Sequence, residues 1–556
     1  MATTRGNASS VVGAVPPREP GLSLAESFLR IPPFPGSKIH RLAADGPRSN
    51  DVASIAKDLR RLRVGGTYWG AQPELPDGCL IVRTGAEVEQ ARQAGGDSPV
   101  VLWTQSSAEK LSGPGVLNIS GDCDPWHMLS RAAGLVTTPD DELRLVAALL
   151  DVPVNLLRAG ELVEDSTGHS ELLARHLPSA FENPFTGQAM TAREAIELSG
   201  FWRQLIDSNR EIVGGLGFAF WKQEQVGPLL WNGSDDFRFL RSASDVAPEG
   251  SVAIWRAKAS SEQIAKLEGA GTRLIEVEDG FLRSTGLGAD CIPPMSITVD
   301  ELGAYFDPSR PSELERLLQD VSFGDELIER ARELRQTIVE AGIGKYEQGG
   351  ATLERPAGDR IHILVPGQVE DDRAVQTGGC GLTSNLELLK RVRTEAPRAY
   401  ILYKPHPDVL AGHRRGAIPD KIALGFADDI VADVPINSLI SMVDEVHVNT
   451  SLAGFEALLR QKKVTTYGVP FYAGWGLTTD LGPVPSRRCT KRSLDELVAA
   501  ALLVYPRYLD PISGLPCPAE VVVARLAAGD ASDPGLLVGV RRLQGKVMRR
   551  LRSLVQ

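Results

Sequence analysis

Apolar runs alternate with amphipathic stretches in the second half of the chain, starting at residue 251. The run SVAIW (251–255) is followed by SEQIAKLEGAG (261–271), whose apolar residues recur at helical spacing, and then by RLIEVE (273–278). This order predicts a strand, a helix and a strand.

The same alternation continues toward the C-terminus, beyond a charged helical stretch at 325–346. Runs rich in Ile, Val and Leu are typical of parallel strands buried on both faces, so we expect two doubly wound α/β domains that face one another. In such sheets ligands bind beyond the carboxyl ends of the strands. The later strands are expected at IHILVPG (361–367), AYILYKPHP (399–407), EVHVN (445–449) and KVTTYG (463–468).

The N-terminal region resembles a degenerate copy of the last part of the chain. At a constant offset of 310, residues 129–154 align with 439–464, and ENPFTGQ (182–188) then echoes LDPISGL (509–515). In this alignment Ser451, Gly454 and Glu456 fall opposite Asp141, Arg144 and Val146. If the later copy holds a site, the first copy has lost it.

These patterns divide the chain into four expected parts. The first, 1–200, is a degenerate α/β half-module. Rossmann-like domains follow at 201–350 and 351–530, and residues 531–556 form a basic amphipathic helix.

The composition is that of a globular protein with an acidic body. Of 556 residues 42% are apolar, and 60 Lys and Arg against 71 Asp and Glu give a formal charge of −11. No apolar run approaches the roughly 18 residues that span a bilayer, and the N-terminus lacks the pattern of a secretory signal, so we expect a cytoplasmic protein. Six scattered cysteines without a C-x-x-C pair argue against a zinc site or a disulfide scaffold. The chain also lacks the P-loop, G-x-S-x-G and H-E-x-x-H motifs, which argues against P-loop NTPases, α/β-hydrolases and zincins.

The last sixteen residues are strongly basic. They hold six cations and no carboxylate, beside an apolar stripe at helical spacing from Val540 to Leu554. Such a helix can lie on the anionic inner-membrane surface, or it can dock on its own domain with a solvated basic face. Nucleic acid is not an expected partner, because the tail has no aromatic residue for stacking and the body is acidic.

Two adjacent carboxylates, Glu278 and Asp279, follow the strand at 273–278, and Gly280 allows a sharp turn after them. Such a pair can supply a general base, and Arg283 with Ser284 can hold an anionic group of a substrate. The alternative is a solvated turn.

The strands at 361–367 and 399–407 also end in polar residues. Gln368 and Asp372 have the spacing Q-x-x-x-D beside Glu370 and Asp371; the three acids either mark a helix N-terminus favoured by the macrodipole, or one of them is a nucleophile. Lys404 and His406 stand in a turn stiffened by two prolines; they can neutralise a phosphate and protonate a leaving oxygen, although a lone histidine is often structural.

Thr450 and Ser451 follow the strand at 445–449 and cap the next helix, whose free N–H groups favour an anion. Glu456, in that helix, can accept hydrogen bonds from ribose hydroxyls, or it is simply solvated. The loop YGVPFYAGWGLTTD (467–480) is rich in glycine and aromatic residues, which suits a sugar or base platform as well as plain loop packing.

Together these stretches resemble the capsular-polysaccharide β-Kdo glycosyltransferases of the KpsC type, which build a Kdo linker on a lipid for capsule export. The matching stretches are FAFWK (218–222), EDGFLRSTGLGAD (278–290), PGQVEDD (366–372), YKPHPDVLAG (403–412), SLAGFEALL (451–459) and YGVPFYAGWGLTTD (467–480). The E/D-D-G and H-P motifs are also shared with bacterial sialyltransferases of GT-B-like fold. The resemblance implies a GT-B-like pair of Rossmann-type domains, with the acceptor bound by 201–350 and the CMP-sugar by 351–530.

The resemblance further implies CMP-β-Kdo as donor and retaining transfer by double displacement. Asp372 is then the candidate nucleophile, and Glu278 or Asp279 the base that activates the acceptor hydroxyl. By the same resemblance we expect His406 and Lys404 to neutralise the CMP phosphate with Thr450 and Ser451, without a metal or a cofactor. Glu456 is expected to bind the ribose, and Arg283 the Kdo carboxylate.

The first copy departs from the family, because it lacks E-D-G, Q-x-x-x-D and K-P-H-P. A transferase that makes a single linkage to a lipid-linked or Kdo-terminated acceptor is therefore expected, held at the inner membrane near other capsule assembly proteins. The alternatives are another CMP-ulosonic or sialic acid donor, or a non-catalytic scaffold for capsule assembly and export.

Overall fold

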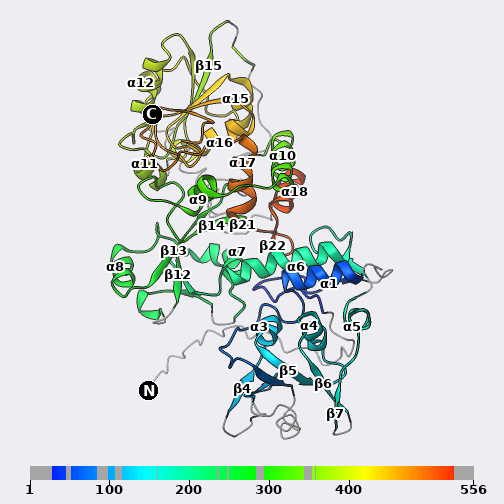
Figure 1. Ribbon diagram of the computed structural model, residues 1–556. Coiled ribbons are helices and arrows are strands. Elements are labelled where there is room, and N and C mark those ends of the chain that lie inside the picture. The colour runs from blue at the N-terminus through cyan, green and yellow to red at the C-terminus, as the bar shows by residue number, and fades with distance from the viewer. Residues whose placement is uncertain are drawn as a thin grey trace, which may run out of the picture.

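A computed structural model shows three α/β units stacked along one axis (Figure 1). It describes residues 28–44, 52–83, 98–106, 110, 115–158, 161–178, 180–234, 237–246, 250–282, 293–343, 354–356, 358–412 and 414–530. The predicted basic helix at 531–556 lies outside these residues. The α/β fold class predicted from the sequence is confirmed.

The C-terminal unit contains a six-stranded sheet in the order β17-β16-β15-β18-β19-β20, in which every neighbouring pair is parallel. Its central strands fall where the apolar runs predicted them, and β15, β16 and β18 are buried along most of their length. The strands are β15 (His362–Pro366), β16 (Tyr400–Lys404), β17 (Asp429–Ile430), β18 (Glu445–Val448), β19 (Lys463–Thr466) and β20 (Thr479–Asp480). The helices are α11 (Arg373–Gly378), α12 (Asn385–Glu395), α13 (Pro407–Leu410), α14 (Asp420–Ala423), α15 (Ile436–Met442), α16 (Leu452–Leu459) and α17 (Leu494–Val498).

The middle unit contains a seven-stranded mixed sheet in the order β11-β10-β12-β13-β14-β21-β22. The first four strands are parallel, and β14, β21 and β22 continue the sheet with antiparallel pairs. The strands are β10 (Ile212–Leu216), β11 (Arg238–Leu240), β12 (Ser251–Ile254), β13 (Arg273–Asp279), β14 (Ser296–Asp300), β21 (Pro506–Leu509) and β22 (Pro516–Cys517). The helices are α7 (Phe220–Leu230), α8 (Ser261–Gly269), α9 (Glu313–Asp320) and α10 (Asp325–Glu340).

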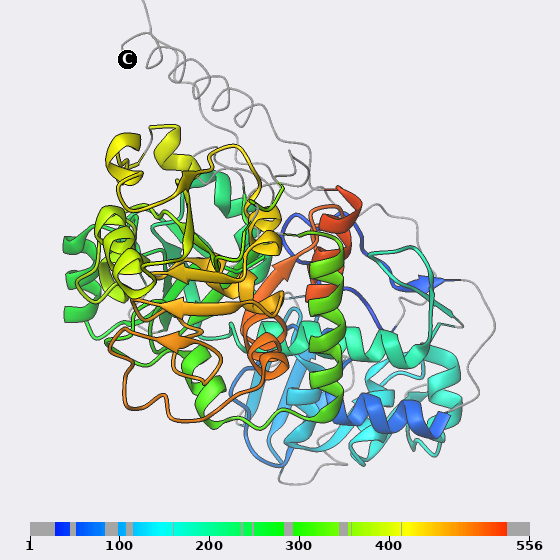
Figure 2. The same cartoon turned by 90° about the horizontal axis from the view of Figure 1, so that it is seen from above.

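Strands β21 and β22 come from the predicted range 351–530 but belong to the middle sheet. Their side chains explain this return, since Tyr508, Leu509 and Cys517 are buried. The following helix α18 (Ala519–Ala528) lies against α10, as Figure 2 shows from above. The C-terminal part of the chain therefore completes the middle unit.

The N-terminal unit contains a six-stranded sheet in the order β4-β3-β2-β5-β6-β7. This is the strand order of the C-terminal sheet, except that the edge strand β7 is antiparallel to β6 whereas β20 is parallel to β19. The strands are β2 (Cys79–Val82), β3 (Val100–Thr104), β4 (Val116–Ser120), β5 (Ala132–Thr137), β6 (Val154–Arg158) and β7 (Glu161–Glu164). The helices are α1 (Val52–Leu62), α3 (Pro125–Ser130), α4 (Leu143–Leu149), α5 (His169–His176) and α6 (Ala192–Asp207).

The predicted internal repeat is visible in these elements. The offset of 310 places α4 on α16 and β6 on β19. Beyond the sheet, the short hairpin β8 (Ala180–Glu182) and β9 (Ala189–Met190) matches the hairpin β21–β22 in sequence order, and β8 also pairs with β1 (Ala43–Ala44).

Helix α6 links the first two units, and it crosses the predicted boundary at residue 200. The indole of Trp202 donates to the Pro516 carbonyl at 2.8 Å, and Arg507 donates to the Asn209 side chain at 2.6 Å. The hairpin is thus held by hydrogen bonds from α6 and the residues that follow it. No described helix is both long enough and apolar enough to cross a membrane.

Candidate active site

The carboxyl end of β13 meets the first turn of α11, which follows β15 in the other sheet. Glu276 and Glu278 are two residues apart, so they project to the same face of β13. Arg373, the first residue of α11, contacts Glu278 at 2.5 Å and Glu276 at 3.3 Å. One arginine therefore joins the two units at the place where both predicted sites lie.

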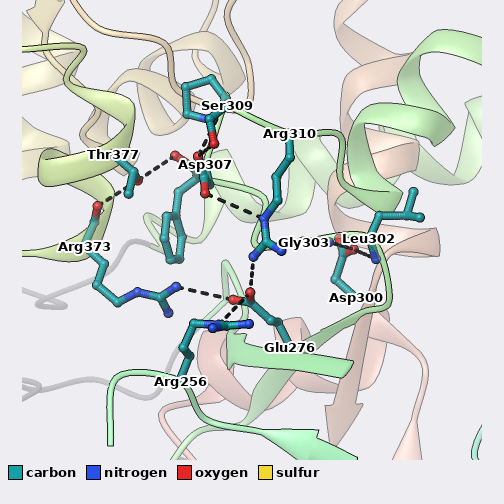
Figure 3. Close-up of polar contacts among 12 residues, drawn as sticks. Arg256, Glu276, Asp300, Leu302, Gly303, Asp307, Ser309, Arg310, Arg373 and Thr377 are labelled. Carbon is teal, nitrogen blue, oxygen red and sulfur yellow. Dashed lines mark hydrogen bonds and ion pairs between the residues drawn. The ribbon is translucent and has the colours of Figure 1, made fainter. Parts of the chain in front are cut away.

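Glu276 is the centre of a cluster of arginines (Figure 3). Its side chain is only 4% exposed, and it accepts from Arg256 at 3.0 Å and also pairs with Arg310. With Arg373, three guanidinium groups from separate segments surround one buried carboxylate. Each of these guanidinium groups also pairs with a second carboxylate: Arg256 with Glu268, Arg310 with Asp307 and Arg373 with Glu278.

Glu278 has an environment suited to a general base. The pKa of its carboxyl is raised to about 7, chiefly by burial, with Asp279 and Glu276 acting in the same direction and Arg373 and Lys222 acting against them. A carboxylate with a pKa close to neutral can accept a proton in a transition state and release it afterwards.

The same pKa predicts a stability cost that grows with pH. The carboxyl keeps its proton in the folded protein between its usual pKa of 4.5 and about 7, so folding stability falls as the pH rises through that range. We expect Glu278→Gln to raise the free energy of unfolding at pH 8 by about 2 kcal/mol more than at pH 5, as measured by urea denaturation. Glu387→Gln, on the exposed face of α12, is the control and should show no such difference.

Asp279 occupies the other face of β13. Lys222 of α7 donates to it at 2.9 Å, and the same ammonium lies 3.6 Å from the centre of the Trp255 ring. Asp279 is therefore paired with a cation of its own unit, whereas Glu278 is paired with Arg373 of the other.

Gln368 and Thr450 lie together at the carboxyl ends of β15 and β18. The Gln368 amide donates to the Thr450 hydroxyl at 3.0 Å and accepts from the Thr450 backbone N–H at 2.9 Å. Asn385 fixes the Gln368 backbone, accepting from its N–H at 2.8 Å. The two strand ends are thus locked in register, as expected from the neighbouring strands.

Asp372 caps α11, so the acids after β15 do mark a helix N-terminus, which is one of the two interpretations of this stretch. One carboxylate oxygen accepts from the Ala374 N–H at 2.9 Å, and the side chain is exposed. Because Arg373 follows it directly and contacts Glu278, Asp372 stands next to the junction of the two sheets. Its second oxygen is not used by the cap.

Lys404 and His406 leave β16 in different directions. Lys404 is buried, and its ammonium donates to the carbonyls of Ala432 and Val434 at 3.0 and 2.6 Å. His406 caps α13, with Nδ1 accepting from the Asp408 N–H at 3.1 Å. When His406 is neutral this contact places its proton on Nε2, which can then donate to a ligand.

Ser451 caps α16, accepting from the Ala453 N–H at 3.2 Å, and its own carbonyl accepts from the Tyr472 hydroxyl at 2.5 Å. Glu456 is buried in the same helix, and not solvated as the alternative had it. The aromatic residues of the loop 467–480 are also buried: Tyr467, Phe471, Tyr472 and Trp475. The prediction of an aromatic platform is therefore wrong, since these rings form loop packing.

Gly454 of α16 packs closely against the hydroxyl group of Tyr472. A Cβ at Gly454 would lie 2.3 Å from the Tyr472 hydroxyl. We expect Gly454→Ala to displace Tyr472 from Ser451 and to lower the free energy of unfolding by about 1–3 kcal/mol. In a parallel urea titration Gly269→Ala in α8, where a Cβ meets open space, should leave stability equal or slightly higher.

Arg283 and Ser284 lie outside the described residues. The residues that sequence reasoning missed are Glu276, Arg373 and Lys222. Each had a signal, since Glu276 shares the strand face of Glu278, Arg373 directly follows Asp372, and Lys222 ends the stretch FAFWK. No group of side chains suited to a metal ion occurs among the residues that the structure describes.

The N-terminal sheet carries a different arrangement at the corresponding edge. Asp141 takes the position of Ser451, accepting from the Leu143 N–H at 3.0 Å. It also accepts from Arg83 at 3.1 Å and from Thr137 at 2.6 Å. A carboxylate of the protein itself thus stands where a helix N-terminus would receive a ligand anion.

Comparison with known proteins gives a consistent family. The family model described as "Capsule polysaccharide biosynthesis protein" matches residues 250–353 and 329–508. These ranges contain every described site residue from Glu276 to Glu456.

Two curated relatives match the chain in part. LipA, a capsule polysaccharide modification protein of Neisseria meningitidis serogroup A, is 39% identical over 339 residues, which are 60% of this chain and 48% of LipA. LpsZ, a lipopolysaccharide-processing protein of Rhizobium meliloti, is 44% identical over 273 residues, 48% of this chain and 57% of LpsZ. The chain thus spans about half the length of the curated relatives it matches.

A solved structure is also similar in sequence. The beta Kdo 2,7 transferase of Thermosulfurimonas dismutans KpsC is 35% identical, with a TM-score of 0.47, and the match covers 58% of this chain and all of that one.

Proposed function

The chain belongs to the capsule polysaccharide biosynthesis protein family, and from this premise we propose that it is a retaining glycosyltransferase which moves Kdo from CMP-Kdo to a glycolipid or a Kdo-terminated oligosaccharide. The observation that carries the proposal is the contact at the junction of the two sheets. There a buried carboxylate with a pKa of about 7, Glu278, meets the helix that Asp372 caps.

The first step of the proposed reaction belongs to Asp372. Its carboxylate attacks the anomeric carbon of Kdo while the bond from that carbon to the CMP phosphate breaks, which leaves a covalent glycosyl-enzyme. His406, whose Nδ1 accepts from the Asp408 N–H, would donate from Nε2 to the departing phosphate, and the N-terminus of α16 with Thr450 and Ser451 would add backbone donors. Lys404 supports this site through the loop carbonyls that it binds, and its charge favours the anion.

The second step belongs to Glu278. It takes the proton of the acceptor hydroxyl while the acceptor oxygen displaces Asp372 from the anomeric carbon. Two inversions give net retention. Gln368 orders the site through Thr450, and Glu456 remains the candidate for the ribose hydroxyls.

The acceptor and the location of the reaction are part of the proposal. A lipid-linked acceptor requires the enzyme to work close to the inner-membrane surface, and the basic residues between Arg541 and Arg552 would attract it there beside other capsule assembly proteins.

Turnover with defined donors and acceptors tests this function. We expect CMP release from CMP-Kdo made in situ, dependent on an acceptor that ends in Kdo, and retention of configuration in the product by NMR. Preference for CMP-sialic acid in a competition assay would assign another donor of the same class. If no donor is consumed, the chain is a non-catalytic scaffold of capsule assembly, and the proposal is wrong.

A further inference from the structure

We propose that Arg373 is a positioning residue that holds Glu278 in the free enzyme and leaves it for an anionic group of the donor. Donor binding then removes the cation that pairs with Glu278, which makes its carboxylate a stronger base toward the acceptor hydroxyl. This inference rests on the proposed function, because it concerns the same donor and the same base.

Arg373 is placed to make this exchange. It comes from the donor-side unit, yet its guanidinium reaches across to two carboxylates of β13, at 2.5 Å to Glu278 and 3.3 Å to Glu276. Its side chain is 31% exposed, whereas the two carboxylates are 15% and 4% exposed. Of the three groups, the arginine is therefore the one that a ligand can reach most easily.

Glu276 does not depend on Arg373. Arg256 and Arg310, both of the middle unit, pair with it on the same oxygen, Oε1 (Figure 3). Arg373 contacts the other oxygen, Oε2, at the longest of the three distances. When Arg373 leaves, Arg256 and Arg310 still neutralise the buried Glu276. Only Glu278 loses its paired cation, so the free-energy cost of the movement comes from Glu278.

The charges that face Glu278 come from three elements. Arg373 lies on α11, Lys222 on α7, and Glu276 and Asp279 on the same strand. Lys222 is already bonded to Asp279 at 2.9 Å. Among the described contacts, Arg373 is thus the cation bonded directly to Glu278, and its removal leaves the carboxylate with two acidic neighbours.

A donor anion is a suitable competitor for this arginine. A guanidinium can bind one phosphate or carboxylate with two parallel hydrogen bonds, whereas here Arg373 makes one contact to Glu278 and one to Glu276. The donor carries both kinds of anion close to the anomeric carbon, and Arg373 directly follows the proposed nucleophile Asp372. With the donor bound, Arg373 pairs either with the phosphate that leaves or with the carboxylate of the sugar. Glu278 is then available to the acceptor hydroxyl.

The exchange has a measurable consequence in protons. When Arg373 leaves, the pKa of Glu278 rises above about 7, so the protein takes up protons as the ligand binds. A rise of about one unit gives an uptake of about 0.4 proton per chain at pH 7. Calorimetry in buffers of different ionisation enthalpy measures this uptake without any turnover.

The titration uses CMP, free Kdo, and both together as probes, so that its arms separate a phosphate from a carboxylate. We expect uptake in the wild type and its loss by at least half in both Glu278→Gln and Arg373→Gln. Arg256→Gln, which removes a cation from Glu276 alone, should retain most of it. Proton uptake by any other group would persist in Glu278→Gln, so the difference between the wild type and this variant isolates the uptake by Glu278.

Two results overturn the inference. Ligand binding with undiminished uptake in Arg373→Gln, or with no uptake in the wild type, rejects the exchange and leaves the proposed function standing. Absence of binding of either probe to the wild type rejects the donor class, and the exchange with it.

Discussion

Asp372→Asn is expected to abolish the covalent glycosyl-enzyme and to slow transfer by at least about 10³-fold. Asparagine caps helices as well as aspartate does, so α11 and Arg373 should stay in place while the nucleophile is lost. Intact-protein mass after incubation with CMP-Kdo made in situ should show an increment of one Kdo in the wild type and none in the variant.

Asp371→Asn is the matched control for this experiment. Asp371 is the adjacent exposed acid, paired with Arg414 at 3.4 Å on the surface. It should form the adduct and turn over within about twofold of the wild type, since exposed pairs contribute little. An adduct of undiminished yield in Asp372→Asn would move the nucleophile elsewhere.

Glu278→Gln is expected to lower transfer by about 10²–10⁴-fold while the glycosyl-enzyme still forms. The amide keeps the size of the side chain but cannot take the acceptor proton, so the adduct should accumulate in the presence of acceptor. Rapid quenching followed by mass measurement separates this outcome from a failure of the first step.

Asp279→Asn decides between the two carboxylates that the sequence left as candidates. Asp279 is already engaged by Lys222 on the other face of β13, so we expect a loss below about tenfold. A larger loss in Asp279→Asn than in Glu278→Gln would assign the base to Asp279.

Much of the fold followed from periodicity. The runs that became β12, β15, β16 and β18 are rich in apolar residues because these strands are buried along most of their length, whereas β13 and β19 are buried only in part. The topological switch in each sheet then brought the polar strand ends to one edge, which is why Gln368 could be expected near Thr450.

The parts that could not be predicted depend on contacts between distant segments. The buried carboxylate of Glu276 is neutralised by three arginines, the farthest of them 97 residues away in the sequence. No local sequence pattern predicts such a pairing. The return of β21 to β14 is likewise set by burial between segments separated by a whole domain. For Lys404 the motif predicted the position at a strand end correctly. It could not predict that the ammonium group binds carbonyl groups of a loop.

The hairpin of β21 and β22 affects the order in which the chain folds during synthesis. Strand β14 leaves the ribosome about 200 residues before its partner β21, so the middle sheet keeps an open edge while the whole C-terminal sheet is being made. The C-terminal sheet can therefore form first. The middle sheet is completed last, when residues 506–517 pair with it. A nascent chain that stalls before residue 506 would expose the unpaired backbone groups of β14, which can pair with another chain. Protection by chaperones is therefore most important while the C-terminal sheet is being synthesised.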